Sequence, residues 1–285
     1  MIKPSMIAQL KAMLPKNQTV ESAIPGLYFY CADRPSEILG YIQEPSICIV
    51  LQGERKIYLG SDCQYFNGSH LMFCPVNLPL RMHIEQATAE QPVIVMSMKL
   101  EIEMIRDMLA KIPPKPKENH AHKGIQWTLD DQLLAVFERL IDLLNRPEDI
   151  TVLSNLIKQE IYYRLLTAEQ GGKLQQLAAN SSHTRQIAQA TEWLKNHLDQ
   201  PIMVEDLAKT CGMSVSMFYQ QFKEITRLSP LQYHKHLRLT EARKLNKAGN
   251  ISIAQIAMQV GYESPSQFSR EYKRQFGVAP SGDRG

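Results

Sequence analysis

Residues 204–230 read VEDLAKTCGMSVSMFYQQFKEITRLSP, and their pattern returns in residues 253–280, IAQIAMQVGYESPSQFSREYKRQFGVAP. Leu207, Ala208 and Gly212 correspond to Ile256, Ala257 and Gly261 at an offset of 49 residues. One inserted residue then makes the offset 50, and the matching pairs are Ser216 and Ser266, Phe218 and Phe268, Phe222 and Tyr272, Lys223 and Lys273, and Pro230 and Pro280. Each copy predicts a short helix, a glycine turn and a second helix, which together form a helix-turn-helix.

The second helix of the first unit is predicted from Val215 to about Ile225. Ser214 can cap it by accepting a hydrogen bond from a free backbone N–H. Phe218, Phe222 and Ile225 share one face, so we expect them to be buried. The open face then carries Ser216, Tyr219, Gln220 and Lys223. Such a face suits contacts to base edges in a DNA major groove, and an ordinary solvated helix has the same pattern, so this helix alone leaves both interpretations open.

The second unit repeats this arrangement with more basic chemistry. Ser264 is the predicted N-cap, Pro265 occupies the first helical position, and Gly277 ends the helix. The residues expected to be buried are Phe268, Tyr272 and Phe276, and those expected to face outward are Ser266, Ser269, Arg270 and Lys273. Arg270 is the candidate for a bidentate contact to guanine or to a phosphate. The predicted phosphate contacts, which position without specifying sequence, are Lys223, Lys273 and Arg274.

A single helix is predicted between the two units, from Ser229-Pro230 to about Ala248. Roughly 18 residues at ~1.5 Å each span about 27 Å. Successive major grooves on one side of B-DNA are ~34 Å apart. The helix is therefore long enough to hold two recognition helices about one turn of DNA apart, which makes the doubled motif a much stronger signal than one copy alone.

The first half of the chain predicts short strands followed by helices. The expected strands are Leu27–Cys31, Ile47–Gln52, Lys56–Leu59, Gln64–Phe66, His70–Cys74, Leu80–Glu85 and Val93–Leu100. Asn67-Gly68 is a hairpin signal, and Pro75 and Pro79 are expected breaks. Strands this short and closely spaced favour a small barrel or sandwich.

Helical spacing is found at both ends of this strand-rich region. A short amphipathic helix near the N-terminus is predicted from Met6, Leu10, Met13 and Leu14, and further helices are predicted at 102–112, 130–145 and 149–168. The wide apolar faces of the last two require either the barrel or the same helices of a second subunit as a partner. Gly171-Gly172 and residues 178–183 indicate a linker, so we place the domain boundary near residue 180.

Composition narrows the class of protein. The chain has 285 residues, 44% of them hydrophobic, with a net charge of +3. From His183 onward 14 Lys and Arg face 9 Asp and Glu, so the positive excess lies in the half that holds the repeat and agrees with a polyanionic partner. No apolar run approaches the ~20 residues of a membrane span, and no secretory signal is visible. The scattered cysteines, Cys31, Cys48, Cys63, Cys74 and Cys211, predict buried thiols in a cytoplasmic protein.

The strand-rich half shows no pattern of catalytic residues, so none is assigned. His70 and His83 stand without a carboxylate at ligand-like spacing, and His120-Ala-His122 lies in a loop rich in proline and lysine, where solvated side chains are favoured over a metal site. Serine nucleophile elbows and phosphate-binding glycine loops are not found. Cys31, Cys48 and Cys74 lack a neighbour that would lower their pKa, so core packing is favoured over sensing of an electrophile.

The doubled motif resembles the AraC/XylS family of bacterial transcription regulators. The residues that carry the resemblance are Leu207-Ala208, Gly212-Met213-Ser214, Phe218, Phe222-Lys223, Ser229-Pro230, Tyr233, Arg238, Ala242, Leu245, Ile253, Ile256-Ala257, Gly261-Tyr262, Ser264, Ser266, Phe268-Ser269-Arg270, Lys273, Phe276-Gly277 and Pro280. The N-terminal half also resembles a companion domain of this family in PSICIVLQGERKIYLG (45–60), in NLPL (77–80), and in EIYYRLL (160–166) before EQGG.

The resemblance implies an α+β protein of two domains. Residues 1–180 would form a cupin-like sensor barrel with accessory helices, and residues 181–285 an all-α DNA-binding domain with helix-turn-helix units at about 204–225 and 253–276. It also implies activation at promoters, with double-stranded DNA, RNA polymerase and a small-molecule or stress signal as partners, and no cofactor. The family's base-contacting positions correspond to Ser216, Tyr219, Gln220, Ser266, Ser269 and Arg270. Gln220 stands where the family often has arginine, and Arg227 replaces a common glycine.

Two other classes of protein fit parts of the pattern. A metal-dependent cupin enzyme with a DNA-binding regulatory tail would need a cluster of metal ligands in the barrel. A DNA-repair protein that shares this helix-turn-helix fold would need a nucleophilic cysteine in a reactive motif. The leading hypothesis remains a sequence-specific transcription regulator, with the identity of its effector and its oligomeric state left open.

Overall fold

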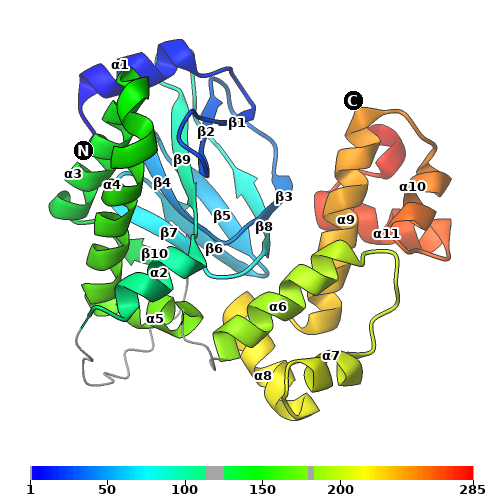
Figure 1. The fold of residues 1–285 in the computed structure, drawn as a ribbon. Helices are drawn as coiled ribbons and strands as arrows, with labels where there is room; N and C mark the ends of the chain where they lie inside the picture. The colour runs from blue at the N-terminus through cyan, green and yellow to red at the C-terminus, as the bar shows by residue number, and fades with distance from the viewer. Residues whose placement is uncertain (1, 113–124, 179–182, 285) are drawn as a thin grey trace.

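The computed structural model describes residues 2–112, 125–178 and 183–284, and it shows two domains in contact (Figure 1). The N-terminal domain consists of two antiparallel sheets and the helices that cover one of them. The C-terminal domain is helical and lies beside β3 and β8 (Figure 1). The predicted α+β class with two domains is confirmed.

The two sheets differ in size. The larger has the order β1-β2-β9-β4-β7-β10, with strands at Thr19–Glu21, Leu27–Ala32, Val93–Lys99, Ser46–Gln52, His70–Cys74 and Gln126–Thr128. The smaller has the order β3-β8-β5-β6, with strands at Leu39–Gln43, Leu78–His83, Arg55–Leu59 and Asp62–Phe66. Apolar side chains of both sheets, including Val50, Leu80 and Val95, form one core between them. This is the predicted barrel-like arrangement, and its interior is packed by alternate residues of each strand.

Helices cover the outer face of the larger sheet. They are α1 (Pro4–Met13), α2 (Ile102–Leu109), α3 (Asp131–Asp142), α4 (Pro147–Thr167) and α5 (Gly172–Ala178). Phe137 and Tyr162 of α3 and α4 join Phe29 and Phe73 of the sheet in one core, which explains the wide apolar faces of these helices. The exposed apolar residues of α4 are Val152, Leu156 and Tyr163. Contact with a second subunit therefore stays a prediction.

Several local expectations were wrong. The strands β1, β3 and β10 were not predicted. At the expected linker, Gly171 ends the short turn η2 (Glu169–Gly171) and Gly172 begins α5. Pro79 was expected to break the chain, yet it lies inside β8 opposite Ile42, in a part of β8 whose register pairs only with β3, so its missing N–H interrupts no second ladder. Asn67-Gly68 does not close a hairpin, because β6 and β7 belong to different sheets.

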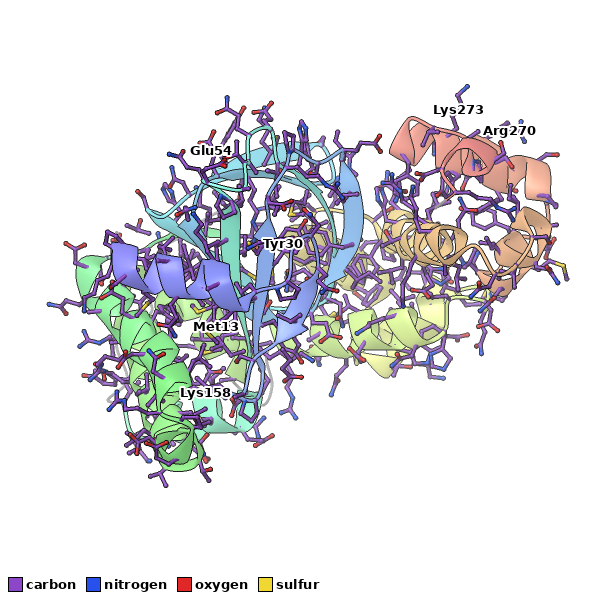
Figure 2. All side chains as sticks on the ribbon, turned by 90° about the horizontal axis from the view of Figure 1, so that it is seen from above. Met13, Tyr30, Glu54, Lys158, Arg270 and Lys273 are labelled. Carbon is purple, nitrogen blue, oxygen red and sulfur yellow. The ribbon has the colours of Figure 1, made fainter. Side chains whose placement is uncertain are left out.

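The solvent exposure of two side chains differs from the prediction, and two further predictions fall on residues that the structure does not describe. Met13 was expected on the buried face of α1 but is 53% exposed (Figure 2). Cys63 is an exposed thiol, whereas the other four cysteines are buried as predicted. The domain boundary near residue 180 and the pair His120 and His122 lie outside the described residues. Within the described part of the chain, the helices are all too short or too polar to cross a membrane.

The helical domain follows the predicted order. Its helices are α6 (His183–Asn196), α7 (Val204–Thr210), α8 (Val215–Thr226), α9 (Pro230–Ala248), α10 (Ile253–Gln259) and α11 (Pro265–Phe276), and the short turn η3 (Pro280–Gly282) follows. The predicted linker helix is α9, and it begins at the expected Ser229 cap, whose side chain accepts from Gln232 N. Two separate apolar cores form around it, one for each helix-turn-helix unit.

Candidate nucleic-acid interface

Each helix-turn-helix unit is held by aromatic side chains on the inner face of its second helix. In the first unit Phe218 and Phe222 are fully buried, and Phe222 meets Tyr233 of α9 edge-on at 5.2 Å between ring centroids. In the second unit Phe268 and Tyr272 are fully buried and tilt against one another at 5.5 Å. Ile225 and Phe276 were also expected to be buried, but both are partly exposed at the edge of their cores. The repeated apolar spacing thus fixes which face of α8 and α11 is left open.

The caps and turns follow the local sequence signals. Ser214 Oγ accepts from Met217 N at 3.3 Å, and Ser264 Oγ accepts from Gln267 N at 3.3 Å. Gly212 and Gly261 take φ values of +64° and +82° in the two turns, where a side chain would be strained. Arg227, which replaces a common family glycine, also has φ +61° and closes α8 in the left-handed conformation. The left-handed turn at the end of α8 therefore forms in this chain even though its residue is an arginine, for which this conformation is strained.

The open faces of α8 and α11 carry the predicted contact residues. Ser216, Tyr219, Gln220, Lys223, Ser266, Arg270, Lys273 and Arg274 are exposed, and Ser269 is partly covered. Arg270 and Lys273 extend from α11 away from the rest of the protein (Figure 2). Among the described residues, neither forms a hydrogen bond or an ion pair with another side chain. These cations are therefore available to phosphates or base edges.

The helix α9 joins the two units and is fastened to both. At its start Tyr233 is buried in the first core, and near its middle Arg238 donates to Leu198 O at 2.5 Å and to Gln200 O at 2.9 Å. Arg238 also lies beside Gly261, where an added Cβ would come within 2.6 Å of its Nη2 atom. The loop after α6, the helix α9 and the turn of the second unit are thus packed into one block.

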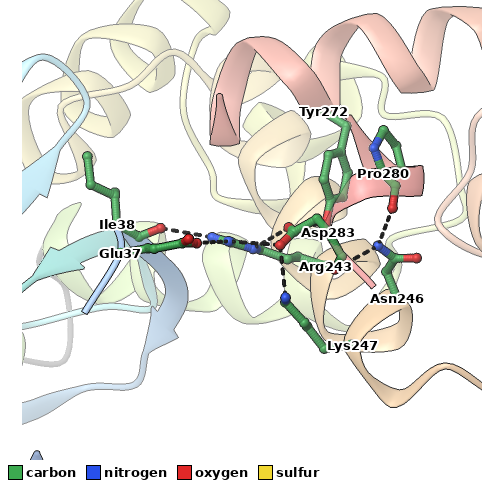
Figure 3. Close-up of polar contacts among 8 residues, drawn as sticks. All are labelled: Glu37, Ile38, Arg243, Asn246, Lys247, Tyr272, Pro280 and Asp283. Carbon is green, nitrogen blue, oxygen red and sulfur yellow. Dashed lines mark hydrogen bonds and ion pairs between the residues drawn. The ribbon is translucent and has the colours of Figure 1, made fainter. Parts of the chain in front are cut away.

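A buried ion network ties the second unit to α9 and to the barrel (Figure 3). Asp283 accepts from Arg243 Nε at 2.8 Å, from Lys247 Nζ at 3.0 Å and from Tyr272 Oη at 2.8 Å. Burial alone would raise the pKa of Asp283, but these hydrogen bonds outweigh it and lower that pKa, so the carboxylate is charged. Arg243 Nη1 also donates to Ile38 O of the barrel at 2.8 Å. Through Asp283, the Arg243 guanidinium therefore connects the barrel to α11, the helix that carries Tyr272.

Two further contacts join the barrel to the helical domain. Tyr233 Oη donates to Asn77 O at 2.5 Å, which fixes the start of α9 against the segment before β8. Gly40 of β3 lies so close to α11 that an added Cβ would be 3.0 Å from Phe276 Cε1. Both units are thus in direct or near-direct contact with the barrel.

A cavity of about 700 Å³ lies where the barrel meets α9. Its barrel wall includes Tyr30, Tyr41 and Arg55, and its α9 wall includes Arg243 and Lys247. The cavity therefore borders the same residues that connect the two domains. His70 and His83 lie on β7 and β8, in different sheets, and in the described part of the chain no three His, Cys, Asp or Glu side chains gather as metal ligands would.

Sequence reasoning did not find Arg243, Asp283 or Arg55. Arg243 and Asp283 are 40 residues apart, and neither belongs to a local motif that indicates pairing. Arg55 falls within the quoted run 45–60, but its burial and its lack of a carboxylate partner among the described residues are properties of the folded barrel. For these three residues no local sequence pattern indicates a functional role, and only the tertiary contacts reveal it.

Comparison with known proteins supports both halves of the chain. Residues 23–173 match the family model of the AraC-type transcriptional regulator N-terminus, and residues 207–285 match a helix-turn-helix domain. The HTH-type transcriptional activator RhaS of Escherichia fergusonii is 28% identical over 166 residues, which cover 58% of this chain and 59% of RhaS. RhaS of Salmonella schwarzengrund is 26% identical over the same length and the same shares. The aligned region thus spans 59% of the length of these relatives.

Solved structures of ToxT from Vibrio cholerae have a similar fold. A ligand-free ToxT variant superposes with a TM-score of 0.56 at 12% identity, covering 92% of this chain and 98% of ToxT. The wild-type ToxT structure with a bound unsaturated fatty acid gives a TM-score of 0.54 at 13% identity, covering 95% of this chain and 96% of ToxT. At this level of identity the likeness concerns the fold and the order of the two domains.

Proposed function

Since this chain belongs to the AraC-type family of transcriptional regulators, we propose that it activates transcription by placing α8 and α11 in successive major grooves of double-stranded promoter DNA. The observation that carries this proposal is the pair of exposed recognition faces joined by one helix of 19 residues. At a rise of ~1.5 Å per residue α9 is about 28 Å long, close to the repeat of B-DNA.

The two faces divide into base-reading and phosphate-binding residues. The proposed base contacts are Ser216, Tyr219 and Gln220 of α8, and Ser266, Ser269 and Arg270 of α11. Lys223, Lys273 and Arg274 would bind phosphates, which position the protein without selecting sequence. Arg270 can make a bidentate contact to guanine, so we expect it to contribute the strongest single preference.

The signal would enter through the barrel. A small molecule in the cavity would touch both the barrel and α9, and the fatty acid bound to ToxT shows that a protein of this fold can bind a small molecule. The regulated step would be recruitment of RNA polymerase at the promoter, as the RhaS relatives are named activators. We propose no enzymatic activity for the chain, and we expect it to act in the cytoplasm, where the bacterial chromosome lies.

Genomic footprinting with the full chain would identify the promoter, and DNA binding of variants would then test the assignment. We expect Arg270→Ala to cost ~1–3 kcal/mol of specific binding and to relax one base position. Arg34→Ala removes an exposed arginine from the barrel with the same change in net charge, and it should leave affinity and sequence preference as they are.

One outcome would contradict the assignment of α11. If Arg270→Ala kept both promoter affinity and sequence preference, α11 would not be the base-reading helix. Failure of the wild-type chain to bind any genomic site would reject the proposed function as a whole.

A further inference from the structure

One cation that lines the cavity differs from all the others there. The lining cations that form ion pairs with carboxylates are Lys99 and Lys195 with Glu44, Lys244 with Glu241, and Arg243 and Lys247 with Asp283. Arg55, at the start of β5, forms no ion pair with any residue that the structure describes. Its charge is therefore the one in the cavity wall that the described residues leave without a balancing carboxylate.

The surroundings of Arg55 make this imbalance costly. The residue is only 5% exposed, and its Nη1 atom has the thioether of Met82 as its acceptor at 3.7 Å. A thioether is a weak acceptor. Its Nε atom is buried without a hydrogen-bond partner among the described residues. A buried guanidinium in this state is destabilising unless an anion reaches it.

A second hydrogen-bond donor lies beside Arg55. The hydroxyl of Tyr41 on β3 is buried with its oxygen next to the Arg55 guanidinium, and its own proton has no acceptor in the described part of the chain. Burial raises the pKa of Tyr41, and the positive charge of Arg55 acts against that rise, as expected for two groups that face one another. Burial likewise raises the pKa of Tyr30 on β2, and the charge of Arg55 again opposes the rise. Hydrogen-bond donors thus converge at the barrel end of the cavity.

We propose that this end of the cavity binds the carboxylate of a small monocarboxylic acid, with Arg55 pairing with its oxygens and Tyr41 donating a hydrogen bond. An arginine fork matches a planar carboxylate, and one unbalanced cation matches a single negative charge rather than a phosphate dianion. Leu39, Met82 and Val95, which also line the cavity, would pack against the apolar body of the acid. A volume of about 700 Å³ lies within the range of small-molecule sites.

This inference rests on the proposed function, because it names the chemical class of the effector. It also gives the signal a path, since Tyr41 and Leu39 belong to β3, and Ile38 just before that strand accepts the hydrogen bond from Arg243 of α9.

The test is calorimetric titration of the full chain with octanoate and 3-phenylpropionate, each matched to its neutral alcohol, octanol or 3-phenylpropanol. We expect the acids to bind at least about 10-fold more tightly than the alcohols, because only a charged acceptor satisfies the guanidinium. Arg55→Met should weaken acid binding about 100-fold and Tyr41→Phe about 10-fold, since each removes hydrogen bonds to a charged group. Arg139→Met, a change of the same type on the surface of α3, should have no effect.

A melting curve shows whether the variants fold. Without ligand, Arg55→Met should melt no lower than the wild type, because it removes an unbalanced buried charge. If it fails to fold, Tyr41→Phe and Arg55→Lys carry the same test, and Arg55→Lys should bind more weakly because a lysine lacks the planar fork.

Four results would overturn the proposal: unchanged acid binding after Arg55→Met, equal binding of acids and alcohols, tighter binding of phenyl phosphate than of 3-phenylpropionate, or no binding of either acid. DNA binding measured on the same preparation separates this inference from the proposed function. A wild-type chain that binds its promoter but no carboxylic acid rejects the inference alone.

Discussion

The two helix-turn-helix units have the same interior and different surfaces. On α8 the exposed Lys223 is followed by the exposed Glu224, and the other proposed contact residues, Ser216, Tyr219 and Gln220, are uncharged. On α11 the exposed cations are Arg270, Lys273 and Arg274, whereas Glu271 is turned toward Tyr262 and Lys235 at 2.8 and 2.9 Å. The second unit thus presents a basic face and the first a nearly neutral one.

This difference shows how the two copies of a duplicated motif can keep the same fold and present different chemical groups to a partner. The buried aromatic positions set where the second helix of each unit lies, and they match between the copies. Under the proposed function the exposed positions would set which bases the helix reads, and they differ between the copies. We therefore expect the second unit to supply most of the affinity and specificity, and the first to add a weaker preference.

The largest expected effect concerns the network that supports the second unit. Asp283→Ala would remove the buried carboxylate that pairs with the Arg243 guanidinium, whose side chain is 7% exposed, and would leave it only the exposed Glu37 at 3.7 Å among the described residues. Breaking such a pair should cost ~3–5 kcal/mol of the free energy of unfolding. Urea denaturation followed by far-UV circular dichroism measures this, with the neighbouring Arg284→Ala as the control. Equal unfolding midpoints for the two variants would show that the network does not hold the second unit.

The two glycine turns offer a sharper comparison. At Gly261 an added Cβ would lie 2.6 Å from Arg238 Nη2 and 2.8 Å from Asp199 O, whereas at Gly212 the nearest atom is 3.8 Å away. Both substitutions carry the left-handed backbone cost of ~1–2 kcal/mol. Gly261→Ala adds overpacking of ~1–3 kcal/mol, since the Asp199 carbonyl cannot easily move. Thermal melts of the two variants should differ in that order, and a larger loss for Gly212→Ala would contradict the packing described for Arg238.

Acid should loosen both units through two histidines of α9. Burial, together with nearby cations, lowers the pKa of His234 beside the first core and of His236 near Arg81 and Arg274, each to about 4. The unfolded chain, with a histidine pKa of about 6.5, binds more protons between these values, so stability is lost as the pH falls from 6.5 toward 4. At pH 5 the loss should be roughly 1–2 kcal/mol per histidine, reduced by partial exposure.

Melting temperatures of His234→Gln and His236→Gln at pH 7 and pH 5 measure these losses. Each variant should have a smaller drop in melting temperature on acidification than the wild type. A drop of the same size in either variant would mean that its histidine does not contribute to acid sensitivity.

The smallest expected effect is on non-specific binding. Lys273→Ala should weaken all duplexes alike by about 1 kcal/mol and reduce the slope of log affinity against log salt by about 0.9. Lys223→Ala should reduce the slope less, because Glu224 already offsets its charge. Salt titrations on specific and random duplexes test this, and a loss limited to one sequence would assign Lys273 to base reading.

The helical domain could be predicted closely because its signals are local. Ser229-Pro230 begins α9 and Gly249 follows its last residue, so cap and stop residues place both ends. The strand β3 was missed because Leu39–Gln43 are all partly exposed, in a strand that contains a glycine and lacks a clear alternation. Its place depends on β8 beside it and on Phe276 above Gly40, which are contacts that a local pattern cannot show.

The exposed contact residues could also be named from the spacing, since the buried aromatic positions leave one face of each helix open. The network around Asp283 could not, because its members come from the segment before β3, from α9 and α11, and from the C-terminal segment. The unbalanced charge of Arg55 is defined by the lack of a carboxylate beside it among the described residues, which only the folded barrel reveals.

Two of the hydrogen bonds between the domains end on main-chain carbonyls of the barrel. Tyr233 donates to Asn77 O, and Arg243 donates to Ile38 O. Every residue type supplies a carbonyl, so these two hydrogen bonds place no demand on the barrel side chains at positions 77 and 38, whereas the α9 side requires a phenol and a guanidinium. Substitutions at these two barrel positions could therefore accumulate during evolution without loss of either hydrogen bond.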